Sequence, residues 1–109
     1  MPEIKHTPGP WAVDNSRYEG SINCMEPFRH IAMTSNFIYD HSSREENAAN
    51  ARLLAAAPEL LADLQEAAAT LRRYETLHRA KGTDDSTAKA EVNATLAARF
   101  EATIAKATE

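Results

Sequence analysis

The chain has 109 residues, of which 43% are hydrophobic, but 21 of them are alanine and few large apolar side chains remain. Because burial of a large side chain contributes roughly 1.5–3 kcal/mol and alanine much less, we expect a thin core. The net charge of −4 argues against an electrostatically driven binder of duplex nucleic acid, and the absence of a long apolar run or a basic-then-apolar leader predicts no membrane segment.

The first forty residues are predicted to form an extended lead-in and a small sheet. Pro8 and Pro10 remove backbone donors and disfavour helix in the residues before them, so residues 1–10 are expected to be extended. Apolar and polar residues then alternate in short runs, as in half-buried strands. The predicted strands are residues 11–13, 21–25 and 29–34, and residues 37–39 offer a fourth. The pattern predicts an antiparallel β-meander over residues 11–40, with inward-facing side chains at Trp11, Val13, Ile22, Cys24, Ile31 and Met33.

The rest of the chain is predicted to be helical, because 19 of the 21 alanines follow residue 47 and alanine is the best helix former. Ser43 fits a helix N-cap with Glu46 three residues later. Pro58 lacks an N–H and interrupts the helix, and Gly82 suits a left-handed C-cap. The predicted helices are residues 43–57, 58–81 and 87–106.

Two apolar stripes follow these helices. The first recurs in alternating steps of four and three, the period of a seam between packed helices, at Leu53, Ala57, Leu60, Leu64, Ala67, Leu71, Tyr74 and His78. The second recurs in steps of four at Ala88, Val92, Leu96, Phe100 and Ile104. The short loop between them predicts an antiparallel helical hairpin within residues 43–107, and the whole chain is expected to be a single α+β domain over residues 1–109.

A homo-oligomer through the helical half is the expected assembly, because two helices cover only part of each other's apolar surface. The alternative is a monomer in which the sheet alone caps the hairpin. The single cysteine, Cys24, cannot form an internal disulfide and favours a reducing compartment such as the cytoplasm.

Two segments resemble a family of short phage and prophage proteins. The chain carries His-Thr-Pro-Gly-Pro-Trp at residues 6–11 and Asn-Ala-Arg-Leu-Leu-Ala-Ala-Ala-Pro-Glu-Leu-Leu at residues 50–61, in the order found in that family. Leu54 stands where isoleucine is more usual, a change of shape with little effect on packing. The resemblance implies a mobile-element accessory protein in the cytoplasm of a bacterial host. Such proteins often act against host defence, by occluding a defence protein or by holding its nucleotide-like signal.

The sheet half offers three candidate ligand-binding residues. Trp11 is expected mainly to cover the end of the helix pair, and its ring would alternatively stack on a base or a similar ring. Arg17 and Arg29 are further candidates for binding an anion.

The helical half offers five more. Asn47, Asn50 and Arg52 would dock the first helix on the sheet or donate to the ribose and phosphate of a ligand. Asn47 and Asn50 are three residues apart and share a helix face, whereas Arg52 points elsewhere. Arg72 and Arg79 are expected to be solvated near the negative end of the helix dipole, with phosphate binding as the alternative.

No residue pattern predicts a metal, a cofactor or catalysis. The spacing of Cys24, His6, His30 and His41 matches no zinc template, so Cys24 is expected to be a small buried hydrophobe. Glycine-rich phosphate loops, paired carboxylates and nucleophile–base motifs are absent from the sequence.

The sequence therefore predicts a non-enzymatic, homo-oligomeric phage accessory protein that counters bacterial antiviral defence by sequestering a nucleotide-derived signal. One alternative is a protein–protein inhibitor of a host defence protein, such as a CRISPR effector. Another is a structural or regulatory phage protein unconnected with immunity.

Overall fold

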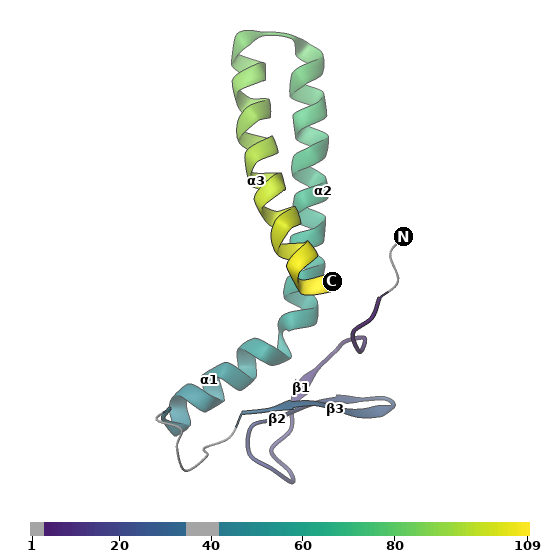
Figure 1. The fold of residues 1–109 in the computed structure, drawn as a ribbon, viewed down its shortest axis with the longest axis vertical. Coiled ribbons are helices and arrows are strands. Elements are labelled where there is room, and N and C mark those ends of the chain that lie inside the picture. Colours follow the sequence, from purple (N-terminus) through teal and green to yellow (C-terminus); the bar gives the residue numbers. More distant parts are fainter. Residues whose placement is uncertain (1–3, 35–41) are drawn as a thin grey trace. The chain divides into compact units, whose positions relative to one another are not determined.

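The computed structural model describes residues 4–34 and 42–109, and the chain forms two compact units, residues 1–60 and 61–109. The elements are β1 (Ala12–Val13), β2 (Ser21–Met25), β3 (Phe28–Met33), α1 (Arg44–Ala55), α2 (Ala57–Lys81) and α3 (Asp84–Thr108), shown in Figure 1. This confirms the predicted α+β class: a three-stranded antiparallel sheet is followed by three helices, of which α2 and α3 pack antiparallel. The predicted fourth strand at residues 37–39 lies outside the described residues.

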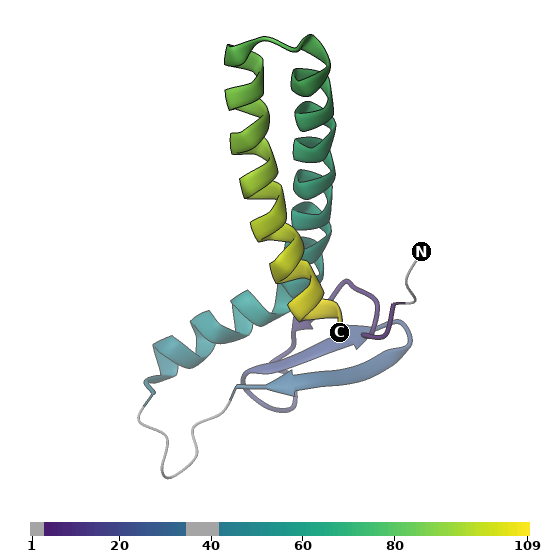
Figure 2. The ribbon, with the colours of Figure 1, turned by 45° about the horizontal axis from the view of Figure 1, so that its top comes forward.

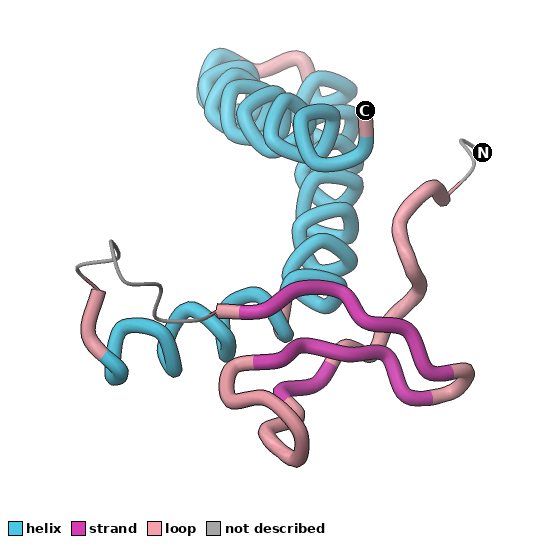
Figure 3. Tube along the Cα trace, turned by 60° about the horizontal axis from the view of Figure 1, so that its bottom comes forward, coloured by secondary structure: helices cyan, strands magenta, loops and turns pink. Residues whose placement is uncertain are grey.

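The sheet has the order β1-β2-β3, and Figure 3 shows the three strands side by side. On β2, Ile22 pairs with Ala32 of β3, but the next residue, Asn23, pairs with His30. Ile31 is therefore one extra residue on β3, which makes this position a β-bulge.

The bulge corrects the predicted inward positions of the sheet. Ile22 and Cys24 are buried as predicted, at 0% and 7% exposure. Met33 was expected to face inward with Ile31, but it pairs with Ser21 and remains 41% exposed. Simple alternation fails here because the extra residue exchanges the two faces of β3 at this point.

Helix α1 belongs to the same unit as the sheet and packs against β1 and β2 (Figure 2). It begins where the sequence predicted, because the Ser43 hydroxyl accepts the backbone N–H of Glu46 at 3.0 Å. Ala51 is its buried residue, at 1% exposure, and so small a side chain lets the helix approach the strands closely.

The two segments that carry the family resemblance meet within this unit. A Cβ placed on Gly9 would lie 2.8 Å from Pro58 Cβ, so only glycine fits at this contact. The Trp11 indole N–H donates to the carbonyl of Thr7 at 3.1 Å, and its ring meets His6 edge-on with ring centres 6.4 Å apart. The lead-in is thus folded against itself and against the first turn of α2.

The second unit is the hairpin of α2 and α3. Gly82 ends α2 in the predicted left-handed conformation, with φ of 69°. The last helix begins earlier than predicted, at Asp84, because the Thr83 side chain already accepts the backbone N–H of Ser86 at 3.1 Å.

The seam of the hairpin differs in part from the predicted stripes. On α3 the less exposed residues alternate in steps of four and three, at Ser86, Ala90, Asn93, Ala97, Phe100 and Ile104. Of the predicted stripe in steps of four, Leu96, Phe100 and Ile104 are less exposed as predicted, whereas Ala88 is exposed and Val92 is 67% exposed, because a strict step of four drifts around the helix. On α2, Leu64, Ala67, Leu71 and His78 lie on the less exposed side as predicted, whereas Leu60 and Tyr74 are exposed.

Ion pairs border the seam of the hairpin. Arg72 contacts Glu101 of α3 at 2.6 Å, and Arg79 contacts Glu91 of α3 at 3.2 Å. Both arginines also contact Glu75 on α2, at 2.8 and 2.9 Å. Hydrogen bonds from Arg72 and then from Arg79 hold the pKa of Glu75 below its ordinary value.

Gly20→Ala is expected to destabilise the sheet unit strongly. Gly20 has φ of 81°, and its added methyl group would collide with the carbonyl of Thr34. Trp11 fluorescence during denaturation reports this unit. Gly82→Ala is the matched control, since Gly82 has a similar φ but open space around it. It should lower the free energy of unfolding, followed by the helical signal, only by the roughly 1–2 kcal/mol that left-handed backbone costs a residue other than glycine. Equal losses for both variants would contradict the proposed collision.

Acid is expected to destabilise the hairpin. A carboxylate whose pKa is lowered by folding stabilises the folded state above its unfolded pKa, and this stability is lost as the pH falls through its folded pKa. The melting temperature of the helical circular dichroism signal should therefore fall between pH 7 and acid conditions below the ordinary value of 4.5. Glu75→Gln should make this dependence shallower, whereas Glu66→Gln, on the exposed side of α2, should leave it unchanged.

Candidate functional site

Two cavities lie against the sheet, both within residues 1–60. The helix-side cavity, of about 310 Å³, is lined by α1, by the strand residue Val13 and by the turn that precedes β2. The open-face pocket, of about 440 Å³, is lined by the same β1–β2 turn and by polar and aromatic side chains of β2 and β3. Val13 pairs with Ile22, and Asn23 follows Ile22 on β2, so the two cavities are on opposite faces of the sheet.

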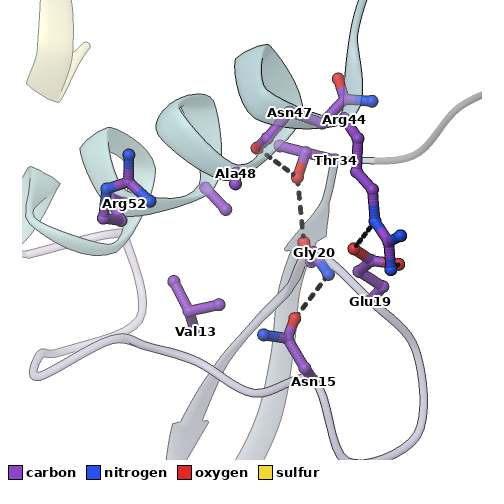
Figure 4. A pocket seen from close by; sticks show the side chains of 10 residues that line it. Val13, Asn15, Glu19, Gly20, Thr34, Arg44, Asn47, Ala48 and Arg52 are labelled. Atoms are coloured by element: carbon purple, nitrogen blue, oxygen red, sulfur yellow. Dashed lines mark hydrogen bonds and ion pairs between the residues drawn. The ribbon is translucent and has the colours of Figure 1, made fainter.

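Most of the polar side chains that line the helix-side cavity are bonded to other residues of the protein. At one end Arg44 makes a bidentate pair with Glu19, at 2.7 and 3.0 Å, and Figure 4 shows Arg52 at the other end. Between them the Thr34 hydroxyl donates to the backbone carbonyl of Asn47 at 3.0 Å, which fastens α1 to the end of β3. The side chain of Arg52 makes no hydrogen bond or ion pair within the described part of the chain, whereas its backbone carbonyl accepts the N–H of Ala56.

The open-face pocket has a floor of connected polar side chains. Asn23 is only 3% exposed, and its amide Nδ2 donates to Asp14 Oδ2 at 3.3 Å. Its Oδ1 accepts from the Ser21 hydroxyl at 3.2 Å and lies 2.9 Å from His30 Nδ1. A buried amide is retained at low cost when its donor and its acceptor are both paired in this way.

Asp14 anchors this floor. Its Oδ1 accepts the backbone N–H of Ser16 at 3.0 Å, which forms a turn that carries the chain from β1 toward residue 18. Hydrogen bonds from the side chain and the backbone of Ser16 are the main reason that the pKa of Asp14 is lowered. The carboxylate is thus ionised and can only accept hydrogen bonds.

That constraint fixes the proton on His30. Asn23 must turn its Nδ2 toward the acceptor-only Asp14, so its Oδ1 faces His30, and His30 Nδ1 must carry a proton to donate to it. Ser21 approaches the same nitrogen, at 3.4 Å, and is itself 6% exposed. The Ser–His pair therefore forms part of a structural network and lacks the geometry of an activated nucleophile.

The rim of the pocket is apolar and cationic. Tyr18 is 64% exposed and Phe28 is 62% exposed, and both line the pocket. Arg17 lies beside them and makes no ion pair within 4 Å in the described ranges. Exposed aromatic rings with one cation around a polar floor suit a planar ligand that carries an anionic group.

The predicted ligand-binding residues are distributed over several places. Arg17 lines the open-face pocket, and Asn47 and Arg52 line the helix-side cavity. Asn50 is exposed and does not line that cavity, so the expected pairing of Asn47 with Asn50 is replaced by Asn47 with Arg52.

The other predicted residues lie outside both cavities. Trp11 hydrogen-bonds to Thr7 and contacts the ring of His6, and its expected place over the end of the helix pair stays a prediction. Arg29 is exposed on β3 opposite Cys24. Arg72 and Arg79 belong to the ion pairs of the hairpin.

Apart from Arg17, sequence reasoning missed the residues that form the open-face pocket. Tyr18 sits in the turn before β2, Phe28 is the first residue of β3, and Asn23 and His30 lie within strands. A signal was present on β2, where Ser21, Asn23 and Met25 alternate with Ile22 and Cys24. A small polar pair that alternates with a buried apolar pair marks a second face of the strand with an environment of its own.

Metal and membrane sites were searched over the same described ranges. Residues 4–34 and 42–109 contain no group of three or more His, Cys, Asp or Glu placed to hold a metal ion. Of the metal candidates considered from the sequence, His41 lies outside those ranges. None of the described helices combines the length and the apolar character needed to cross a bilayer.

Comparison with curated proteins and with solved structures gives no match. A family of phage proteins, described as Salmonella phage P22 protein Y8K6, matches residues 1–109. Since this match spans the sheet, both cavities and the hairpin, the chain belongs to the family of Salmonella phage P22 protein Y8K6.

Proposed function

We propose that this phage protein binds a nucleotide-derived small molecule in its open-face pocket and performs no chemistry on it. In an infected bacterium, such binding would remove a nucleotide signal from a host defence system. The phage family supports an accessory role during infection, and the pocket supports a ligand of this class.

The observation that carries the proposal is the combination of floor and rim in one pocket. A volume of about 440 Å³ lies within the range of small-ligand sites, roughly 300–1,000 Å³. Tyr18 and Phe28 offer aromatic faces on which a base would stack, worth about 1–3 kcal/mol per base. Arg17 would receive a phosphate through a charge-assisted hydrogen bond.

Binding is tested by titrating the full chain with cyclic nucleotides, mononucleotides and ADP-ribose derivatives in a calorimeter. We expect at least one of them to bind at micromolar concentration. Tyr18→Ala should weaken that binding about tenfold or more because it removes the stacking ring. Tyr18→Phe keeps the ring and should retain most of the affinity.

Charge is tested in parallel. Arg17→Gln should weaken binding of phosphorylated ligands and reduce the dependence of affinity on salt. Arg99→Gln makes the same change of net charge on the exposed surface of α3 and should bind like the unmodified protein. If no nucleotide binds, the proposal is wrong. It is also wrong if neither Tyr18→Ala nor Arg17→Gln changes the affinity.

We further propose that the chain is a homo-oligomer through its hairpin, which would also multiply the number of ligand sites. The support is the exposed apolar side chains of α2 and α3: Tyr74 is 50% exposed, Leu77 60% and Val92 67%. Residues of this kind are normally covered when they form a contiguous patch. Tyr74 and Leu77 are three residues apart and so share one side of α2.

Sedimentation equilibrium should give a mass that is a multiple of the 12.0 kDa chain. Tyr74→Gln combined with Leu77→Gln should shift the distribution toward the single chain without loss of helical signal. Leu53→Gln, an exposed leucine on α1, is the control and should leave the mass unchanged. A compact single chain at micromolar concentration would exclude the oligomer. If a host protein occupied this surface instead, it would co-purify with the single chain.

A further inference from the structure

We infer that the open-face pocket selects guanine among the nucleobases, because its floor presents hydrogen-bond acceptors where guanine presents adjacent donors. This inference deepens the proposed function and rests on it. It is carried by the hydrogen bonds of the floor, which are independent of the stacking and charge arguments for the rim.

The first acceptor is the Asp14 carboxylate. Oδ1 accepts the backbone N–H of Ser16, Oδ2 accepts the amide of Asn23, and the Ser16 side chain also hydrogen-bonds to this carboxylate. The two oxygens together offer about four lone-pair positions, so the carboxylate can still accept a donor from a ligand. Asp14 lines the pocket and is only partly buried, which leaves this capacity accessible to a ligand.

The second acceptor is Nε2 of His30. Because His30 Nδ1 carries the proton that it donates to Asn23, the neutral ring has a bare Nε2. His30 is exposed on the pocket side of β3, so this nitrogen can meet a ligand. The position of the proton on the His30 ring depends on the chain of hydrogen bonds that begins at Asp14 and passes through Asn23.

The common bases differ in what they would offer to such a floor. Guanine carries two adjacent donors, N1–H and the N2 amino group, and presents no acceptor on that edge that would be repelled by a carboxylate. Adenine places the acceptor N1 beside its amino group, and this lone pair would face the carboxylate. Hypoxanthine retains N1–H but lacks the amino group, so it would make one of the two bonds.

The charges of the pocket also distinguish the base from the phosphate. A carboxylate repels a phosphate, so the anionic end of the ligand would pair with Arg17, which lines the same pocket and whose charge also helps to lower the pKa of Asp14. Tyr18 and Phe28 would then cover the base itself. Floor and rim thus assign different parts of one guanine nucleotide to different residues.

The test compares GMP, IMP and AMP by calorimetry on the full, unmodified chain. We expect GMP to bind about tenfold or more tighter than AMP, with IMP between them, because a hydrogen bond to a charged group is lost at each step. Equal affinity for all three would overturn guanine selection while leaving nucleotide binding established. Tighter binding of AMP would also overturn it, and the absence of binding by all three would overturn the selection together with the proposed function.

A variant then tests whether Asp14 causes the preference. Asp14→Asn replaces one acceptor oxygen by a donor and should remove most of the difference between GMP and AMP. Asp85→Asn is the control, because it makes the same charge change on exposed α3, and it should preserve the preference. Trp11 fluorescence checks that the variant sheet unit is folded; if it is not, the comparison of GMP with IMP on the unmodified chain still decides the inference.

Discussion

The sheet unit depends on the packing of α1 over Ile22, the one large side chain among the described residues that is completely removed from solvent. Its neighbours in the core are small: Cys24 on the same strand and Ala51 on the helix. In the hairpin the buried apolar residues are all alanines. With so little apolar surface to bury, much of the specificity comes from helix caps, ion pairs and side-chain hydrogen bonds. Polar side chains therefore have a structural role here as well as the binding role that we propose.

Strand β2 unites these two roles, because its alternate residues belong to different environments. Ile22 and Cys24 face the apolar core, whereas Ser21 and Asn23 belong to the polar floor, and all four are buried. A strand of this kind cannot shift by one residue without placing an amide in the core and an apolar group in the pocket. The buried network thus fixes the register that the small core alone would specify weakly.

Local features of the fold could be predicted from the sequence, and features that depend on register could not. The caps at Ser43 and Gly82 and the strands of the meander follow from residue type and short-range spacing. The bulge at Ile31 leaves no local signal, because it depends on how two strands pair, and it places Met33 and Ala32 on the faces opposite to those predicted. Residue type likewise suggested that arginines would bind a ligand, but their places depend on how the strands and helices pack. Of the predicted arginines, Arg17 and Arg52 line cavities and have no ion-pair partner in the described ranges.

The bulge has a consequence for how this surface can vary. Met33 follows His30 by three positions, an offset that places residues of a regular strand on opposite faces, yet both line the open-face pocket because Ile31 is an extra residue between them. Loss of Ile31 would return β3 to regular alternation with His30 still opposite Asn23 and Ala32 still opposite Ile22, so Met33 and His30 would both stay on the pocket side. Loss of a paired residue of β3 would instead shift the register of the floor. The binding surface is therefore open to replacement of side chains at Tyr18 or Phe28 and to loss of the bulge residue, but not to loss of a paired one.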